Sequence, residues 1–201
     1  FIKKIREGGF AETKPLWDIN ADQLAAAKTE LKKELKESKS LVRKNKLFAK
    51  LDPDRQTAAI TARGVGEKAG QKNALTRENL KRMIFKDGQQ VILALNKQDT
   101  DESREILALF KQWADEINDE AERLENSDLT GRTSFGRVVL IDQFDFEEQK
   151  LIVNAADFVV VSSLYEAAGF TELCGAGTLV VTTGHLEGVF QGSGYALDKE
   201  N

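Results

Sequence analysis

From residue 57 onward, the hydrophobic positions gather in short unbroken runs and do not alternate with polar positions. Unbroken apolar runs are typical of strands that are covered on both faces. The runs predict strands at 57–62, 90–96, 137–142, 157–163 and 178–183. Longer amphipathic stretches between them predict helices at about 76–85, 102–124, 146–155 and 168–176.

Strand and helix alternate along this part of the chain, which predicts parallel strands joined by crossover helices. The expected fold class is α/β, a doubly wound, mainly parallel, Rossmann-like sheet. Before it, a helix is expected after Asn20, which would be its N-cap, with Gln23 completing a capping box. Pro53 predicts a turn. We therefore divide the chain into a helical lead-in segment over 1–50 and a Rossmann-like lobe over 51–201.

Composition narrows the classes of protein to consider. The 201 residues carry a net charge of −4, which argues against nucleic acid as the main partner. No apolar run approaches the roughly 20 residues of a membrane helix, and the first residues do not resemble a signal peptide. The single cysteine, Cys174, excludes an internal disulfide framework and suits a reducing, cytoplasmic location. Because the chain begins at Phe1, we expect a piece of a longer protein.

The sequence after the strand at 157–163 suggests an anion site. Ligands of doubly wound sheets bind beyond the carboxyl ends of the strands. In LYEAAGFTEL, the N–H groups of Gly169, Phe170 and Thr171 fall in the first turn of an expected helix. Such groups lack partners within the helix and lie at the positive end of its dipole, so they can bind phosphate. A glycine here can equally serve tight packing alone.

The loop after the strand at 57–62 supplies two cations, Arg63 and Lys68, among glycines in RGVGEKAG. Arginine can contact phosphate through two nitrogens, and lysine acts as a mobile point charge. Together they would suit a diphosphate and stabilise charge on a phosphate leaving group. Both could instead be solvated loop side chains. The loop is neither a Walker A sequence nor GxGxxG.

A carboxylate, Glu166, precedes the expected helix start. Because a carboxylate repels phosphate, Glu166 is better suited to accept hydrogen bonds from the hydroxyls of a sugar beside the phosphates. The alternative is a cap, since an acid near a helix N-terminus stabilises the helix dipole without any ligand.

Three stretches resemble retaining glycosyltransferases with the GT-B fold. RGVGEK resembles their Arg/Lys pair, and YEAAGFTELCGAGTLVVTTGHLEGV is similar to the matching stretch of bacterial glycogen and starch synthases. GRVVLIDQFDFEEQKLIVNAADFVVVSS resembles the segment that holds the nucleotide base, which makes Phe144 a candidate nucleotide-binding residue. The similarity covers about 51–197, the donor-binding lobe of that family.

The resemblance implies a function and roles for the site residues. The chain would be the donor lobe of an enzyme that transfers glucose from ADP- or UDP-glucose to an α-glucan, without a metal or other cofactor. Arg63 and Lys68 would hold the diphosphate and Glu166 the donor glucose, as catalytic residues. The amides at 169–171 would bind phosphate. An acceptor lobe would precede this one, so the isolated chain is expected to be inactive.

Two other interpretations stay open. α-Glucan phosphorylases share the fold but attach pyridoxal phosphate to a lysine eight positions after the matching Glu. Here that position is Cys174, which cannot form the Schiff base, so no pyridoxal phosphate is expected. Many relatives carry a second Glu at the same position. A lobe of this fold could also be a non-catalytic scaffold that binds a partner or a glucan.

Overall fold

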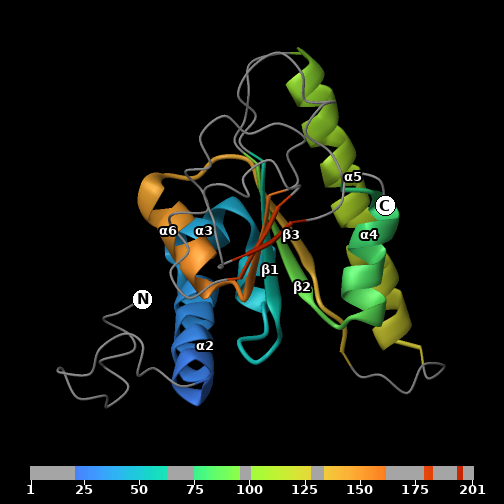
Figure 1. Cartoon of the computed structure of the whole chain (residues 1–201). Coiled ribbons are helices and arrows are strands. Elements are labelled where there is room, and N and C mark those ends of the chain that lie inside the picture. Colours follow the sequence, from blue (N-terminus) through green and yellow to red (C-terminus); the bar gives the residue numbers. More distant parts are fainter. Residues whose placement is uncertain are drawn as a thin grey trace.

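A parallel sheet of six strands forms the centre of the protein, in the order β3-β2-β1-β4-β5-β6 (Figure 1). The computed structural model describes residues 21–62, 75–95, 101–127, 134–161, 179–182 and 194–196. The strands are β1 (Thr57–Ala62), β2 (Gln90–Leu95), β3 (Val138–Ile141), β4 (Phe158–Val161), β5 (Leu179–Thr182) and β6 (Gly194–Ala196). The helical elements are α2 (Ala21–Glu37), α3 (Lys39–Lys44), η2 (Lys46–Lys50), α4 (Arg77–Lys81), η4 (Arg82–Lys86), α5 (Asp101–Glu125) and α6 (Phe146–Ala155).

Helices cover both faces of the sheet. α4 and α5 lie on one face, and α2, α3 and α6 lie on the other (Figure 1). The chain moves outward from β1 through β2 to β3 on the first face, and α6 then leads it back across the second face to β4. Crossovers of a single hand require this change of face when the direction of winding reverses. The predicted doubly wound α/β fold is therefore confirmed.

Successive residues of each strand point to opposite faces, and both faces are buried. Ala59, Ile92 and Val139 are neighbours across three strands and belong to the core cluster under α2, α3 and α6. The residues that precede them, Ala58, Val91 and Val138, belong to the cluster under α4 and α5. Two buried faces explain why these strands are unbroken apolar runs.

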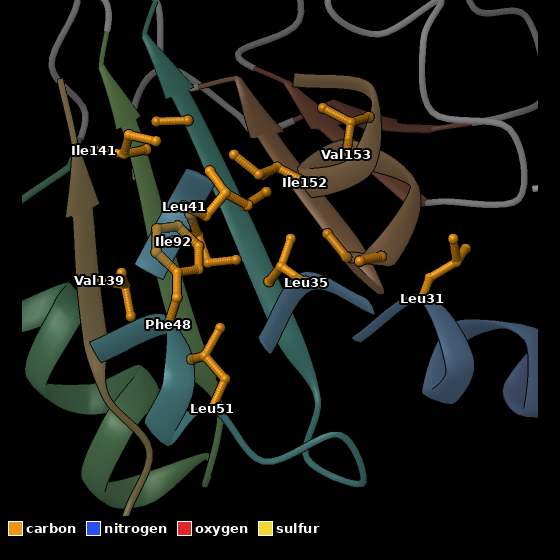
Figure 2. Packing of buried hydrophobic residues seen from close by; sticks show 14 of the residues in the cluster. Leu31, Leu35, Leu41, Phe48, Leu51, Ile92, Val139, Ile141, Ile152 and Val153 are labelled. Carbon is orange, nitrogen blue, oxygen red and sulfur yellow. The ribbon is translucent and has the colours of Figure 1, made fainter. Parts of the chain in front are cut away.

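The segment before the first strand contributes to the same core. Leu35, Leu41 and Phe48, from α2, α3 and η2, are fully buried against Ile92 and its neighbours (Figure 2). Each large aliphatic side chain buried in this way stabilises the fold by about 2 kcal/mol. Residues 21–50 thus cover one face of the sheet, while the domain boundary at residue 50 stays a prediction.

Two asparagine side chains form hydrogen bonds with the backbone of β3, one of the two edge strands of the sheet. The Asn118 side chain accepts from Val138 N at 2.9 Å and donates to Val138 O at 2.8 Å, as a neighbouring strand would. Asn45 Nδ2 donates to Leu140 O at 2.9 Å. These bonds satisfy backbone groups that would otherwise be open to pairing with another chain.

Most of the predicted elements are confirmed by the structure. β1 and α6 have the predicted bounds, and the turn at Pro53 is present. The helix predicted at 76–85 is a short α-helix followed by a π-helical turn. β6 was not predicted, because three residues that include Gly194 give no apolar run. Asn20 and the helix predicted at 168–176 lie outside the described residues.

Buried lysines of α2 attach this helix to the end of α6 and to Asp157, the residue before β4. Lys28 Nζ donates to the carbonyls of Asn154 at 2.8 Å and Ala156 at 2.5 Å. Lys32 pairs with Asp157 at 2.6 Å, whose carboxylate also accepts from Thr57 N. The pKa of Lys28 is lowered to about 8, mainly by burial and to a smaller extent by Lys32, against the opposing effect of Asp157.

The low pKa of Lys28 predicts a gain in stability at alkaline pH. Between pH 8 and the pKa of about 10.4 of a lysine in an unfolded chain, the unfolded state binds more protons, so the free energy of unfolding rises with pH. This gain amounts to about 3 kcal/mol across the window, and we expect it to be absent from Lys28→Met. Urea unfolding of the unsubstituted protein and of Lys28→Met, at several pH values from about 7.5 to about 10.5, measures this gain. If the free energies of unfolding of the two proteins differed by the same amount at every pH, this would contradict the lowered pKa of Lys28.

Two glycines predict different costs of substitution by alanine. A Cβ on Gly136 would lie 1.9 Å from Gln89 O, so backbone must move, and we expect Gly136→Ala to destabilise by about 3 kcal/mol. Gly88 has φ +68°, and a Cβ there would meet Arg55 Nη1 at 3.8 Å, an ordinary contact, so Gly88→Ala should cost only about 1 kcal/mol. Denaturant unfolding compares the two variants, and equal losses would show that the backbone at Gly136 yields easily.

Candidate functional site

The strand order reverses between β1 and β4. These two strands are parallel neighbours, with Ile60 opposite Val160, so their carboxyl ends, at Ala62 and Val161, lie at the same edge of the sheet. The helix that follows β1 covers one face and the helix that precedes β4 covers the other (Figure 1). In sheets of this kind, ligands bind in the crevice at such a reversal.

Most of the predicted site residues follow these two strand ends in sequence. Arg63 is the residue directly after β1, and Glu166 comes five residues after β4. The predicted residues outside the described part of the chain are Arg63, Lys68, Glu166, Gly169, Phe170 and Thr171. Their assigned roles stay predictions. The structure places the strands that lead to them.

Phe144 is the predicted site residue that the structure describes. It follows β3 by three residues, at the same carboxyl edge, and precedes the first turn of α6. Its side chain is half-buried and packs against the core cluster on the face of α2, α3 and α6. The next aromatic ring, Phe146, is 61% exposed, and Lys150 Nζ lies 5.3 Å from its centroid. Two rings thus flank the end of β3, one anchored in the core and one facing solvent.

A capping box holds the connection between β3 and α6. The Asp145 carboxylate accepts from Glu148 N at 2.8 Å, and Glu148 Oε2 accepts from Asp145 N at 3.0 Å. Sequence reasoning missed this box, although the signal was present as an acid followed three residues later by Glu. The box fixes the backbone on the C-terminal side of Phe144.

Glu148 also connects α6 to α3. Its carboxylate accepts hydrogen bonds from Ser40 Oγ and from Lys44 Nζ. Burial alone would raise the pKa of Glu148, but the hydrogen bonds from Lys44, Ser40 and the Asp145 backbone outweigh it, so the pKa lies below its ordinary value. The contact is long-range, since these partners are more than a hundred residues apart in the chain.

The described part of the carboxyl edge near α6 is acidic. Asp142, Asp145 and Glu147 are exposed there, and Lys150 is next to Glu147 at 3.4 Å. Asp101, at the start of α5, pairs with Arg104. Acids repel a phosphate, so an anion at this edge needs cations from elsewhere in the chain. The sequence offers Arg63 and Lys68 directly after β1.

The described residues contain no group of three or more His, Cys, Asp or Glu side chains that could hold a metal ion. None of the helices in this part of the chain combines the length and apolarity that a membrane span requires.

The fold is similar to that of GT-B glycosyltransferases. No protein-family model matches the chain, and no curated protein matches it. Among solved structures, sucrose-phosphate synthase from Thermosynechococcus elongatus matches with a TM-score of 0.51 and 16% identity, over 98% of this chain and 53% of that one. A trehalose-6-phosphate synthase from E. coli, bound with UDP-2-fluoro glucose, matches with a TM-score of 0.46 and 16% identity, over 90% of this chain and 34% of that one.

This chain therefore spans about half the length of the sucrose-phosphate synthase. At this identity the likeness establishes the fold, and the expected GT-B type of fold is confirmed. The finer resemblance, to bacterial glycogen and starch synthases, stays a prediction.

Two neighbouring acids, one buried and one exposed, allow the contribution of the α3–α6 contact to stability to be tested. Glu148 is 7% exposed and holds Lys44, whereas Glu147 is 78% exposed. We expect Glu148→Gln to lower the free energy of unfolding at pH 7 by about 1–3 kcal/mol, because it removes a charge-assisted hydrogen bond. Glu147→Gln is the matched control and should change it by less than about 0.5 kcal/mol.

The loss of stability in Glu148→Gln should also depend on pH. Because the pKa of Glu148 is lowered in the folded state, its stabilisation is present above the pKa of about 4.3 of an unfolded glutamate. It is lost as the pH falls through the folded pKa. Unfolding curves of both variants, collected from pH 7 down to acid pH, measure this dependence. Equal losses of stability in Glu148→Gln and Glu147→Gln would contradict a stabilising role for the contact between Glu148 and Lys44.

Proposed function

We propose that the chain is the donor-nucleotide lobe of a retaining glucosyltransferase. It would transfer glucose from ADP- or UDP-glucose to an α-glucan, with the acceptor held by a second lobe. The observation that carries the proposal is the reversal of strand order between β1 and β4. It brings together the ends of the two strands that precede Arg63 and Glu166, the predicted diphosphate and sugar ligands.

The length of chain between the strand ends and these residues supports their meeting over one crevice. Arg63 is bonded to Ala62, and Lys68 follows Ala62 by six residues, which span at most about 20 Å. Glu166 follows Val161 by five residues, at most about 17 Å. Since neighbouring strands lie about 4.8 Å apart, all three residues can reach the space above β1 and β4.

Phe144 supports a direction for the nucleotide. β3 is two strands from β1, a lateral distance of about 10 Å. An extended nucleoside diphosphate can bridge this distance, with its base near Phe144 and its diphosphate above β1 and β4. The exposed acids around Asp142 and Asp145 disfavour the opposite direction, because they would repel the diphosphate.

Each residue then has a distinct role in the proposed reaction. Arg63 and Lys68 bind the diphosphate and stabilise the negative charge that develops on it as the bond to glucose breaks. The amides of Gly169, Phe170 and Thr171 donate to the phosphate at the positive end of a helix dipole. Glu166 accepts hydrogen bonds from the glucose hydroxyls. With two cations and a helix dipole, the diphosphate needs no metal, and we propose neither a metal nor pyridoxal phosphate.

The sucrose-phosphate synthase that shares the fold is a glycosyltransferase, which supports a transferase. The choice of a glucan as acceptor and of ADP- or UDP-glucose as donor rests on the sequence resemblance. A pyridoxal adduct on a lysine, detected after borohydride reduction, would favour the phosphorylase interpretation over this one.

Titration calorimetry of the chain with ADP and UDP, without magnesium, tests the proposal. We expect weak binding, which Arg63→Ala or Lys68→Ala should weaken by about 1–3 kcal/mol through loss of a charge-assisted hydrogen bond. Glu166→Gln should leave nucleotide binding nearly unchanged, because Glu166 is assigned to the sugar. Lys46→Ala, on η2, is the matched control for loss of a positive charge.

Two outcomes would contradict the proposal. One is no heat at millimolar nucleotide, which would favour a non-catalytic scaffold. The other is loss of binding in Glu166→Gln while Arg63→Ala and Lys68→Ala bind normally.

A further inference from the structure

A hollow of about 780 Å³ lies between η4 and the last turns of α5. Its lining includes Lys86 of η4, Leu124 of α5, and Phe135, which comes three residues before β3. These residues lie near the amino ends of β2 and β3. The hollow is therefore at the opposite end of the sheet from the carboxyl ends of β1 and β4. Its volume falls within the range of small-molecule sites, about 300–1,000 Å³.

The floor of the hollow is aromatic. The rings of Phe85 and Phe135 meet edge to face, with centroids 5.3 Å apart and an angle of 68° between planes. Phe135 is buried, and Phe85 and Leu124 are half-buried beside it. A flat apolar body could therefore lie against Phe85 and Leu124, with Phe135 fixed beneath by the core.

The rim of the hollow carries three cations and one carboxylate. Lys81 pairs with Glu120 at 2.7 Å and lies 5.9 Å from the centroid of Phe85, so this pair is satisfied. Arg82 is 66% exposed and lies 3.7 Å from Asp87, a distant pair. Within the described residues, the structure gives Lys86 no ion pair. Arg82 and Lys86 thus leave positive charge available at the rim.

A π-helical turn places these two cations together. Asp87 N donates to Arg82 O at 3.0 Å, five residues back, and Gln89 N donates to Met83 O at 2.8 Å. The wide turn brings Arg82, Phe85 and Lys86 to the same hollow. Single π-turns are rare in helices and are frequent at functional sites.

We propose that the hollow binds a small phosphomonoester whose organic part is a ring. The ring lies against Phe85 and Leu124, and the phosphate is held by Arg82 and Lys86. Arginine suits this role because its guanidinium group can donate two parallel hydrogen bonds to one phosphate. The site is independent of the donor crevice, because none of its residues belongs to that edge of the sheet.

Calorimetry of the full chain with phenyl phosphate tests the proposal, with inorganic phosphate and phenol as the two half-ligands. We expect phenyl phosphate to bind about tenfold or more tightly than either half-ligand, a difference of about 1.4 kcal/mol. The double substitution Arg82→Gln with Lys86→Gln should weaken phenyl phosphate binding about tenfold or more. Phe85→Leu should weaken phenyl phosphate and leave inorganic phosphate unchanged. Lys111→Gln, exposed on α5 and outside the hollow, is the control and should change nothing.

Arg63→Ala separates this proposal from the proposed function, since it should weaken nucleotide binding and leave phenyl phosphate binding unchanged. Three results would overturn the inference: no binding of phenyl phosphate at millimolar concentration, equal binding of phenyl phosphate and inorganic phosphate, or unchanged binding in the Arg82 and Lys86 double variant. A thermal melt of each variant confirms that it is folded, as expected for two exposed side chains.

Discussion

The hand of the crossover between parallel strands is the constraint on which the rest of the structure depends. Because crossovers are right-handed, the winding from β1 to β3 places α4 and α5 on one face of the sheet. The return to β4 then places α6 on the other face (Figure 1). Both faces are buried as a consequence, and the strand order reverses between β1 and β4, the position where ligands bind in sheets of this kind. The hand of the crossover therefore explains both the buried core and the position of the candidate site.

Polar side chains form hydrogen bonds with groups that the sheet and its helices leave without partners. Asn118 and Asn45 pair with the outer edge of β3. Lys28 satisfies carbonyls at the end of α6, and Glu148 joins the start of α6 to α3. The contacts of Asn45, Lys28 and Glu148 fix α2, α3 and α6 relative to one another and to the sheet, and so fix the loop that carries Phe144.

The sequence predicted the fold well because burial on two faces leaves a strong local signal. The strand at Thr57–Ala62 and the helix at Phe146–Ala155 follow directly from runs of apolar residues and their spacing. β6 has no such run, and the π-turn at Arg82–Lys86 depends on the geometry of the chain that leads into β2. Neither can be predicted from hydrophobic pattern.

The candidate site was predictable only in part. The rule that ligands bind at carboxyl ends directed attention to the residues after each strand, and the strand order places β1 beside β4. Contacts such as Lys44 with Glu148 join residues 104 apart in the chain, so local sequence gives no sign of the partner. The hollow beside Arg82 and Lys86 likewise forms only where η4 lies beside α5, so local sequence does not predict it.

The proposed function requires a nucleoside diphosphate to bind at the carboxyl edge, across the reversal of strand order. Amide chemical-shift mapping of the isotope-labelled chain during titration with UDP or ADP tests it most directly. We expect the largest shifts at Ala62, Phe144 and Val161, with little change at Lys86 and Leu124. Shifts confined to Lys86, Leu124 and their neighbours, with the carboxyl edge unmoved, would contradict it.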